Sequence, residues 1–330
     1  MKVMRLERPA PAEESPLRLS ELEDPRAGAG QVAIEVAACA VCRTDLHILE
    51  GEVSSRLPIV PGHQAAGRVI QAGRGVEGFG LGEFVGVGWM ASTCGICSSC
   101  RSGRENLCAQ ATFTGRDRDG GYAERLVADA RWVYPLPEGF GPRDAAPLLC
   151  AGIIGYRSLK LSEIRPGARL GLFGFGASAH LAIQVALHWQ CEVFAFTREE
   201  HHRRLAREMG AVWSGDTGDD PGIPLDAAVT FAPAGEVVVA ALSRLGRGAT
   251  VAVNAIHMSP IPSFEYERLY GERAIRSVMN YTRRDADEFL ELAAGIPIRA
   301  TVETFPLEAA NEALQRVKRG EIDGAAVLTI

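Results

Sequence analysis

Apolar residues in the first third of the chain occur in short runs that are broken by glycine and polar residues. The clearest runs are QVAIEVAACAVC at 31–42, AAGRVIQAG at 65–73 and GEFVGVGWM at 82–90. Short valine-rich runs bounded by turn-forming residues are typical of β-strands. We therefore predict a compact β-barrel-like lobe for this part of the chain.

From Ala168 onwards, apolar strands alternate with stretches of helical periodicity. The segment 168–176 ends in a glycine turn and precedes a predicted helix over 177–190. The elements expected after it are a strand at 191–197, a charged helix at 198–211, strands at 226–232, 249–256 and 274–280, a helix at 285–295 and an apolar tail at 324–330. Alternating strands and helices are typical of a parallel, doubly wound sheet.

Length and composition limit the class of protein. The chain has 330 residues, a formal net charge of -6 and 47% hydrophobic residues, which is enough for two domains with substantial cores. The mild acidity and the lack of a basic run argue against a nucleic-acid partner. No window approaches the roughly 20 apolar residues that cross a bilayer, and the N-terminal residues lack the apolar run of a signal peptide. We expect a cytoplasmic protein whose thiols stay reduced.

Four of the eight cysteines lie close together, in CGICSSCRSGRENLC at 94–108. Two disulfides within this loop are one interpretation, but a reducing compartment disfavours them. Four closely spaced thiolates suit tetrahedral zinc, and the small and polar residues between them let the loop wrap around an ion. We predict a structural zinc site whose four ligands all come from the protein: Cys94, Cys97, Cys100 and Cys108.

The glycine turn GFGASA is a second candidate site, because it leaves a predicted strand and opens a predicted helix. Its G-x-G-x-x-A spacing is typical of dinucleotide-binding turns. Gly174 permits a tight turn, and Gly176 lets a pyrophosphate approach the backbone. The start of the helix, at Ala177 and Ser178, stabilises the negative charge. The alternative is a glycine turn that only packs a βαβ unit.

The end of the following strand predicts which dinucleotide is preferred. Enzymes that select NAD carry an Asp or Glu there, which accepts a hydrogen bond from the ribose 2′-hydroxyl. This chain has Thr197 and Arg198 instead, a hydroxyl and a guanidinium that suit a 2′-phosphate. We predict a preference for NADP(H) over NAD(H). The alternative is that Arg198 is only a solvated helix-start residue, and Glu199 and Glu200 weaken the positive field.

Several motifs together resemble one family along essentially the whole chain. They are CRTDLH at 42–47, PGHQAAG at 61–67, the four-cysteine loop, GGYAE at 120–124, PLLCAGIIGY at 147–156 and GFGASAH at 174–180. Their order and spacing resemble zinc-dependent alcohol dehydrogenases of the medium-chain dehydrogenase/reductase superfamily, in the bacterial and yeast-like branch. The resemblance implies a catalytic zinc held by Cys42, His63 and Cys150, with the fourth position open to water or substrate.

The resemblance also implies roles for four residues around that metal. Thr44 matches the hydroxyl of the family's proton relay, and His47 matches the outer base of that relay. The alternative for His47 is a surface turn residue. Asp45 matches the carboxylate that orients the zinc-bound histidine, with helix capping as the alternative. Trp89 matches a tryptophan that lines the pocket for small alcohols, with plain core as the alternative.

Three positions depart from the family pattern. Gln64 follows His63 where the family usually has Glu, so a role in metal exchange is in doubt there. Ile154 stands where many relatives carry a Thr beside the nicotinamide, and Ala325 stands where many carry a basic residue that binds the pyrophosphate. Outside the two cysteine clusters, we interpret Cys39 and Cys191 as small buried filler.

These observations predict an α/β protein with a GroES-like β-barrel catalytic domain and a Rossmann doubly wound parallel-sheet domain. We place the catalytic domain at 1–147, completed by 283–330, and the dinucleotide-binding domain at 148–282. The predicted activity is reversible hydride transfer between an alcohol and NAD(P)+, with two zinc ions per chain. The expected partners are a small alcohol, aldehyde or ketone and further copies of the chain. A polyol or sugar dehydrogenase, a zinc-free quinone reductase and a non-catalytic dinucleotide-binding relative are the alternatives.

Overall fold

The computed structural model describes all residues, 1–330, and the chain divides into two compact units. The first unit comprises Met1–Cys150 and Asn280–Ile330, and the second comprises Ala151–Met279. None of the helices combines the length and the apolarity that crossing a membrane requires.

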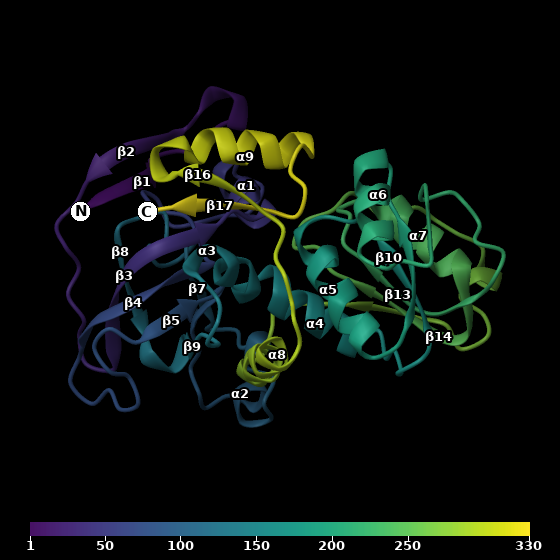
Figure 1. Ribbon diagram of the computed structural model, residues 1–330, viewed down its shortest axis with the longest axis horizontal. Coiled ribbons are helices and arrows are strands. Elements are labelled where there is room, and N and C mark those ends of the chain that lie inside the picture. The colour runs from purple at the N-terminus through teal and green to yellow at the C-terminus, as the bar shows by residue number, and fades with distance from the viewer. The chain divides into compact units, whose positions relative to one another are not determined.

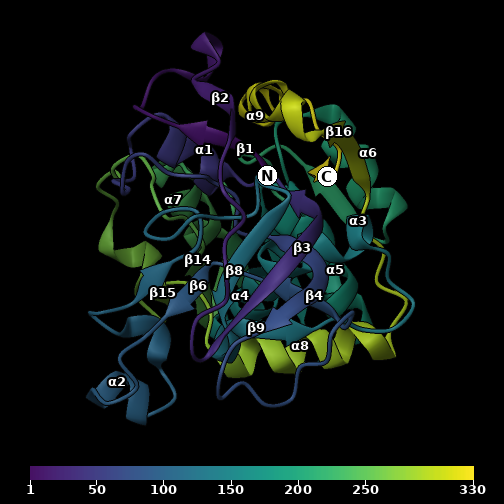
Figure 2. The same cartoon turned by 90° about the vertical axis from the view of Figure 1, so that its left-hand side faces the viewer.

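The first unit is built on a seven-stranded sheet around β3 (Gln31–Ala40). One edge of β3 pairs antiparallel with β4 (Ala65–Ala72) along most of its length. The other edge pairs with two strands in turn, β8 (Arg125–Asp129) along its first half and β17 (Ala325–Thr329) near its end. Figure 2 shows β8, β3 and β4 side by side. The C-terminal tail therefore completes the sheet that the N-terminal segment begins.

The remaining elements of this unit extend or cover that sheet. Its other strands are β5 (Phe84–Val87), β9 (Val133–Pro135) and β16 (Val302–Pro306). Two strand pairs stand apart from it: β1 (Lys2–Leu6) with β2 (Leu17–Glu21), and β6 (Met90–Ser92) with β7 (Thr112–Phe113). The helices of the unit are α1 (Arg43–Leu49), α2 (Ser98–Arg101), α3 (Pro142–Ala145), α8 (Arg283–Gly295) and α9 (Ala310–Arg319). Its 3-10 turns are η1 (Ala12–Glu14), η2 (Glu105–Leu107), η3 (Ala130–Trp132), η4 (Ala146–Leu149) and η6 (Leu307–Ala309).

The second unit is a six-stranded parallel sheet in the order β12-β11-β10-β13-β14-β15. Its strands are β10 (Arg169–Phe173), β11 (Glu192–Phe196), β12 (Trp213–Gly215), β13 (Leu225–Thr230), β14 (Leu245–Val253) and β15 (Ala274–Ser277). The chain order reverses between β10 and β13, which makes this a doubly wound sheet with a switch point at the end of β10. In such a sheet, ligands bind beyond the carboxyl ends of the strands at the switch point.

Helices cover this sheet, which is why its central strands are apolar on both faces. The helices are α4 (Ala151–Leu161), α5 (Ala177–His188), α6 (Glu200–Glu208) and α7 (Gly235–Arg244), with a 3-10 turn, η5, at Tyr266–Arg268. In Figure 1, α4 and α5 lie side by side. The α7 side chains Val238 and Leu242 pack in one buried cluster with Phe173 and Val251 from the sheet.

The α5 histidine His180 is completely buried, and burial lowers its pKa to about 4. Since an unfolded histidine has a pKa near 6.5, the unfolded chain binds this proton first as the pH falls. The stabilisation is therefore intact above pH 6.5 and is lost progressively down to about pH 4. We predict a loss of about 2 kcal/mol in unfolding free energy between pH 7 and pH 5 from this group.

Denaturant unfolding at both pH values tests this prediction with two variants. His180→Leu is expected to reduce the pH dependence by about that amount. His188→Gln changes a less buried histidine on the same helix and is expected to keep the wild-type difference. A His180→Leu variant that loses as much stability as the wild type at pH 5 contradicts the assignment.

Candidate functional site

Two thiols and one imidazole from distant parts of the first unit converge in one place. Cys42 caps α1, His63 lies in the loop before β4, and Cys150 directly follows η4. Their ligand atoms all lie within 4.8 Å of one another. Two sulfurs and one ring nitrogen form a donor set that suits zinc with one position left open.

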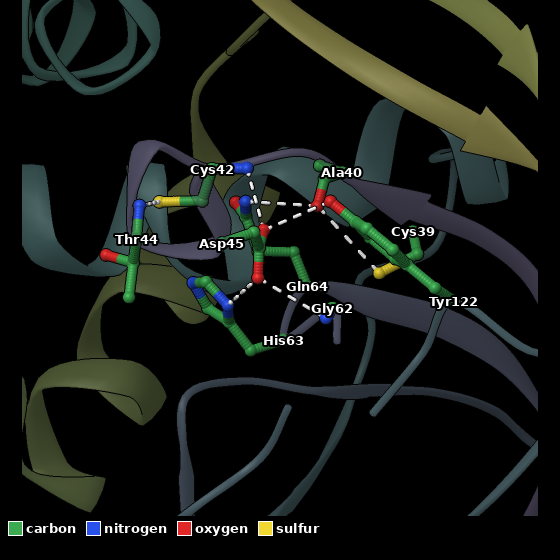
Figure 3. Close-up of polar contacts among 9 residues, drawn as sticks. All are labelled: Cys39, Ala40, Cys42, Thr44, Asp45, Gly62, His63, Gln64 and Tyr122. Carbon is green, nitrogen blue, oxygen red and sulfur yellow. Dashed lines mark hydrogen bonds and ion pairs between the residues drawn. The ribbon is translucent and has the colours of Figure 1, made fainter. Parts of the chain in front are cut away.

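Asp45 fixes the orientation of the His63 ring, as Figure 3 shows. The Nδ1 atom of His63 lies 2.9 Å from Oδ1 of Asp45, and both side chains are buried. In the neutral ring, Nδ1–H donates to the carboxylate and the lone pair resides on Nε2, which is buried and has no hydrogen-bond partner. A buried polar atom without a partner is costly unless it serves another purpose, and metal ligation is such a purpose.

Three more hydrogen bonds hold the Asp45 carboxylate itself. It accepts from the backbone N–H groups of Cys42 (2.9 Å) and Gly62 (3.3 Å) and from the Tyr122 hydroxyl (3.2 Å). The bond from Cys42 also closes a capping box at the start of α1. The same carboxylate therefore ties the segments that carry two of the three donor residues, so the expected capping and orienting roles of Asp45 are compatible.

The donor cluster is electrostatically favourable for a cation. A hydrogen bond from Cys150 and the neighbouring His63 lower the pKa of Cys42 well below its usual range, although burial opposes this. The bond to Cys42 and burial raise the pKa of Cys150. Burial also opposes a charge on His63, but Asp45 and Cys42 outweigh it and raise the pKa of His63 to about 10. The carboxylate of Asp45 and the favoured thiolate of Cys42 thus attract a cation to this cluster, and a metal ion on Nε2 of His63 would take the place of a proton there.

The four cysteines of residues 94–108 form a second cluster, also within 4.8 Å of one another. The Sγ atom of Cys100 lies 3.5 Å from that of Cys97 and 3.9 Å from that of Cys94, while the Cys108 and Cys94 sulfurs are 3.6 Å apart. All four are thiols, because a disulfide needs sulfurs about 2.05 Å apart. Backbone N–H groups of Ile96 and Cys97 lower the pKa of Cys94 to about 6. Burial and the hydrogen bond with Cys97 raise the pKa of Cys100 to about 11. The four sulfurs nevertheless lie close enough together to ligate one ion.

The other residues expected near the metal lie on α1 and beside His63. The Thr44 backbone N–H points at the Cys42 sulfur, 3.5 Å away, and His47 lies on the same helix with its Nδ1 against Glu52. Trp89 is buried and packs edge-on against the His63 ring, with centroids 4.8 Å apart. Trp89 also stacks on Phe113, with ring centroids 5.0 Å apart. Trp89 is therefore both core and a wall of the donor cluster.

In the second unit, the glycine turn joins β10 to α5 at the switch point of the sheet. Gly174 has φ +88°, and a Cβ there would approach the Ala232 nitrogen to 3.0 Å, so the turn requires glycine. A Cβ on Gly176 would meet nothing within 4 Å, so the space in front of it is open. Gly176 caps α5 without a side-chain hydrogen bond, so the first N–H groups, at Ala177 and Ser178, can bind an anion.

The residues after β11 carry a guanidinium that faces solvent. Thr197 is buried, and its carbonyl accepts from Arg203, whereas the Arg198 side chain is exposed. Glu200 is paired with two arginines of α6, at 2.8 Å from Arg203 and 2.9 Å from Arg207. The negative charge of Glu200 is therefore largely compensated and weakens the field of Arg198 less than the sequence alone indicates.

Comparison with known proteins identifies the family. A "Probable alcohol dehydrogenase AdhA" of Mycobacterium tuberculosis is 45% identical over all of this chain and 97% of its own length. The chain belongs to the alcohol dehydrogenase family. An alcohol dehydrogenase of Geobacillus stearothermophilus is 33% identical over 95% of this chain and 96% of its own length. Residues 28–138 match the alcohol dehydrogenase GroES-like domain.

Solved structures of alcohol dehydrogenases agree with this assignment. A thermostable alcohol dehydrogenase from Pyrobaculum aerophilum, with cobalt and zinc bound, superposes with a TM-score of 0.90 at 25% identity, over 100% of this chain and 99% of its own. The predicted combination of a GroES-like domain with a Rossmann parallel sheet is confirmed. The predicted oxidoreductase activity on alcohols and aldehydes is confirmed at the level of the family.

The three departures from the family pattern fall in ordinary structural positions of this alcohol dehydrogenase. The Gln64 amide donates to the Ala40 carbonyl at 3.3 Å, and the Ile154 carbonyl accepts from Ser158 within α4. Ala325 is buried in β17. Three further residues contact the candidate site residues: Tyr122, Phe113 and Glu52. The GGYAE motif contains Tyr122, but no sequence signal indicates Phe113 or Glu52.

Proposed function

We propose that this alcohol dehydrogenase is zinc-dependent and transfers a hydride between an alcohol and a nicotinamide dinucleotide. Cys42, His63 and Cys150 would hold the catalytic zinc. The observation that carries this proposal is the buried Nε2 of His63, which has no hydrogen-bond partner and lies with two sulfurs within 4.8 Å. The cobalt and zinc in the Pyrobaculum relative support it. A bound zinc would supply Lewis-acid chemistry, lowering the pKa of an alcohol hydroxyl and stabilising negative charge on oxygen.

The residues around Cys42, His63 and Cys150 would orient the histidine ligand, limit the space beside it and transfer the alcohol proton. Asp45 keeps the Nδ1–H of His63 engaged, so that Nε2 stays available for ligation. The Trp89 indole packs against the His63 ring and restricts the space beside it. We assign the Thr44 hydroxyl to the first transfer of the alcohol proton and the His47 imidazole to the second, because a histidine exchanges protons readily near neutral pH.

The four-cysteine loop would hold a second, structural zinc. Its four sulfurs would fill the coordination shell of the ion and leave no position for substrate. Its role is therefore to order the segment between β6 and β7.

We assign the second unit to the dinucleotide. The open space in front of Gly176 and the N–H groups at the start of α5 suit a pyrophosphate. Thr197 and Arg198 follow β11, where the adenosine ribose of a dinucleotide binds in this type of sheet. A hydroxyl and an exposed guanidinium favour NADP(H) over NAD(H).

Replacing Arg198 tests the cofactor preference. Arg198→Ala is expected to lower kcat/KM for NADP+ by about 10- to 100-fold, because a charge-assisted hydrogen bond to phosphate contributes about 1.5–3 kcal/mol. The value for NAD+ should change little. Arg204→Ala is the control, since Arg204 is an exposed α6 arginine that pairs with Glu208. A wild type that uses NADH as well as NADPH, or an Arg198→Ala variant with an unchanged ratio, contradicts the preference.

A steady-state screen tests the function as a whole. Primary, secondary and polyhydric alcohols are offered with NADP+ and NAD+, and reduced cofactor is followed by absorbance. We expect turnover of simple alcohols, and none after zinc is removed by a chelator. Turnover that persists without zinc, or no turnover by the zinc-loaded protein, refutes the proposal.

A further inference from the structure

The imidazole of His47 is held by a carboxylate that no motif indicates. Its Nδ1 atom contacts a carboxylate oxygen of Glu52. His47 lies near the end of α1, and Glu52 follows the helix after Gly51, whose φ of +79° turns the chain back. The Val53 N–H donates to the His47 carbonyl at 3.1 Å and closes this turn. The local fold therefore brings the carboxylate to the ring.

This contact determines where the imidazole carries its proton. Because a carboxylate only accepts, the proton of a neutral ring is placed on Nδ1, and the lone pair on Nε2. The arrangement repeats that of Asp45 and His63, since both carboxylates engage Nδ1 of a histidine. The exposure of the two carboxylates differs, however. The Asp45 side chain is fully buried, whereas that of Glu52 is 40% exposed and the His47 side chain only 9%.

Other charged groups on the surrounding elements have partners of their own. The pairs and hydrogen bonds around α1 are Lys318 with Glu50 and Glu13, Arg43 with the Val317 carbonyl, Arg56 with Asp119, and Arg116 with the Ser54 carbonyl. Glu52 is thus the carboxylate that directly contacts the His47 ring.

We propose that Glu52 is a positioning residue of the proton relay, which keeps His47 in the tautomer that can accept a proton at Nε2. This inference rests on the proposed function of His47. Alcohol oxidation releases one hydride, which goes to the nicotinamide, and one proton. The Thr44 hydroxyl accepts this proton and at the same time donates its own proton to Nε2 of His47. The resulting imidazolium is neutralised by the Glu52 carboxylate. It then loses one proton to water, so the ring begins and ends neutral.

Three variants of Glu52 separate its charge from its shape. Glu52→Gln keeps the shape and removes the charge, Glu52→Ala removes both, and Glu52→Asp keeps the charge. In Glu52→Gln the imidazolium lacks its anionic partner and loses its proton more readily. The acid limb of the kcat/KM profile for alcohol oxidation should therefore move to lower pH by about one unit. Glu52→Ala should also lose about tenfold in kcat, partly restored by added imidazole buffer, whereas Glu52→Asp should stay close to wild type.

A readout independent of activity is the 15N NMR spectrum of the seven histidines in the full chain. The His47 signals are assigned by their loss in His47→Gln. We expect the Nδ1-protonated pattern in the wild type and a mixture of tautomers in Glu52→Ala. Glu13→Gln removes another exposed carboxylate, one that pairs with Lys318, and should leave spectrum and pH profile unchanged.

The possible results test the role of Glu52 separately from the proposed alcohol dehydrogenase function. An unchanged His47 tautomer and an unchanged acid limb in Glu52→Gln and Glu52→Ala overturn the role of Glu52, while alcohol oxidation by the wild type still supports the proposed function. A wild type with no alcohol oxidation refutes the proposed function. The NMR comparison then still decides whether Glu52 sets the tautomer.

Discussion

Replacing Cys42 by serine is expected to abolish alcohol oxidation without unfolding the protein. Serine is a good N-cap, so α1 should still begin at Arg43. The neutral hydroxyl, however, is a poor zinc ligand compared with a thiolate. Since a Lewis-acid metal contributes several kcal/mol to the stabilisation of negative charge, we expect kcat/KM to fall by about a thousandfold or more. Zinc content should fall from two per chain to one.

Cys39→Ala is the matched control for this experiment. Cys39 is a buried cysteine on β3, three residues before Cys42, and its Sγ approaches the Ala40 carbonyl. Burial raises the pKa of Cys39, which therefore stays a neutral thiol. The control should keep both zinc ions and wild-type turnover. If Cys42→Ser keeps both zinc ions and full activity, Cys42 is not a ligand of the catalytic zinc.

Replacing Cys108 by serine should instead lower the thermal stability of the protein. The loop from Cys94 to Cys108 contains few buried side chains, so the metal is its main support. Structural zinc contributes about 10 kcal/mol or more in zinc fingers, and a loss of one third of this would lower Tm by about 10 °C. Zinc content again falls by one, but the remaining ion should be the catalytic one, so activity persists at low temperature.

Limited proteolysis shows whether the loss of stability in Cys108→Ser comes from the four-cysteine loop. Arg101 and Arg104 are exposed in this loop and offer trypsin two sites once the loop loosens. Ser98→Ala, an exposed change within the loop, should keep the wild-type Tm and cleavage rate. If Cys108→Ser has the same Tm and the same resistance to trypsin as Ser98→Ala, the loop does not depend on a metal.

Sequence reasoning was sufficient where the physical signal is local. The spacing of the four cysteines predicts that they gather in one place, and their sulfurs do lie within 4.8 Å of one another. The central parallel strands of the second unit stand out as apolar runs, whereas the three-residue strand β12 is too short to give such a signal and was not predicted. The helix α7 was not predicted, because its Val237–Val239 run of β-branched residues is equally typical of a strand. The helices α4 and α9 were not predicted either.

The proposed catalytic zinc ligands could not be found from the sequence by physical reasoning alone. Cys42, His63 and Cys150 approach one another only because η4 and the loop before β4 meet the start of α1. Their assignment came from the resemblance to a family. The contact between His47 and Glu52 depends on the turn at Gly51, and neither spacing nor composition indicates it.

The most direct test of a catalytic metal centre is anomalous X-ray scattering at the zinc edge from crystals of the zinc-loaded protein. We expect two peaks per chain, one bounded by Cys42, His63 and Cys150 and the other within the four-cysteine loop. A single peak in the loop, with no metal beside His63, would contradict this expectation.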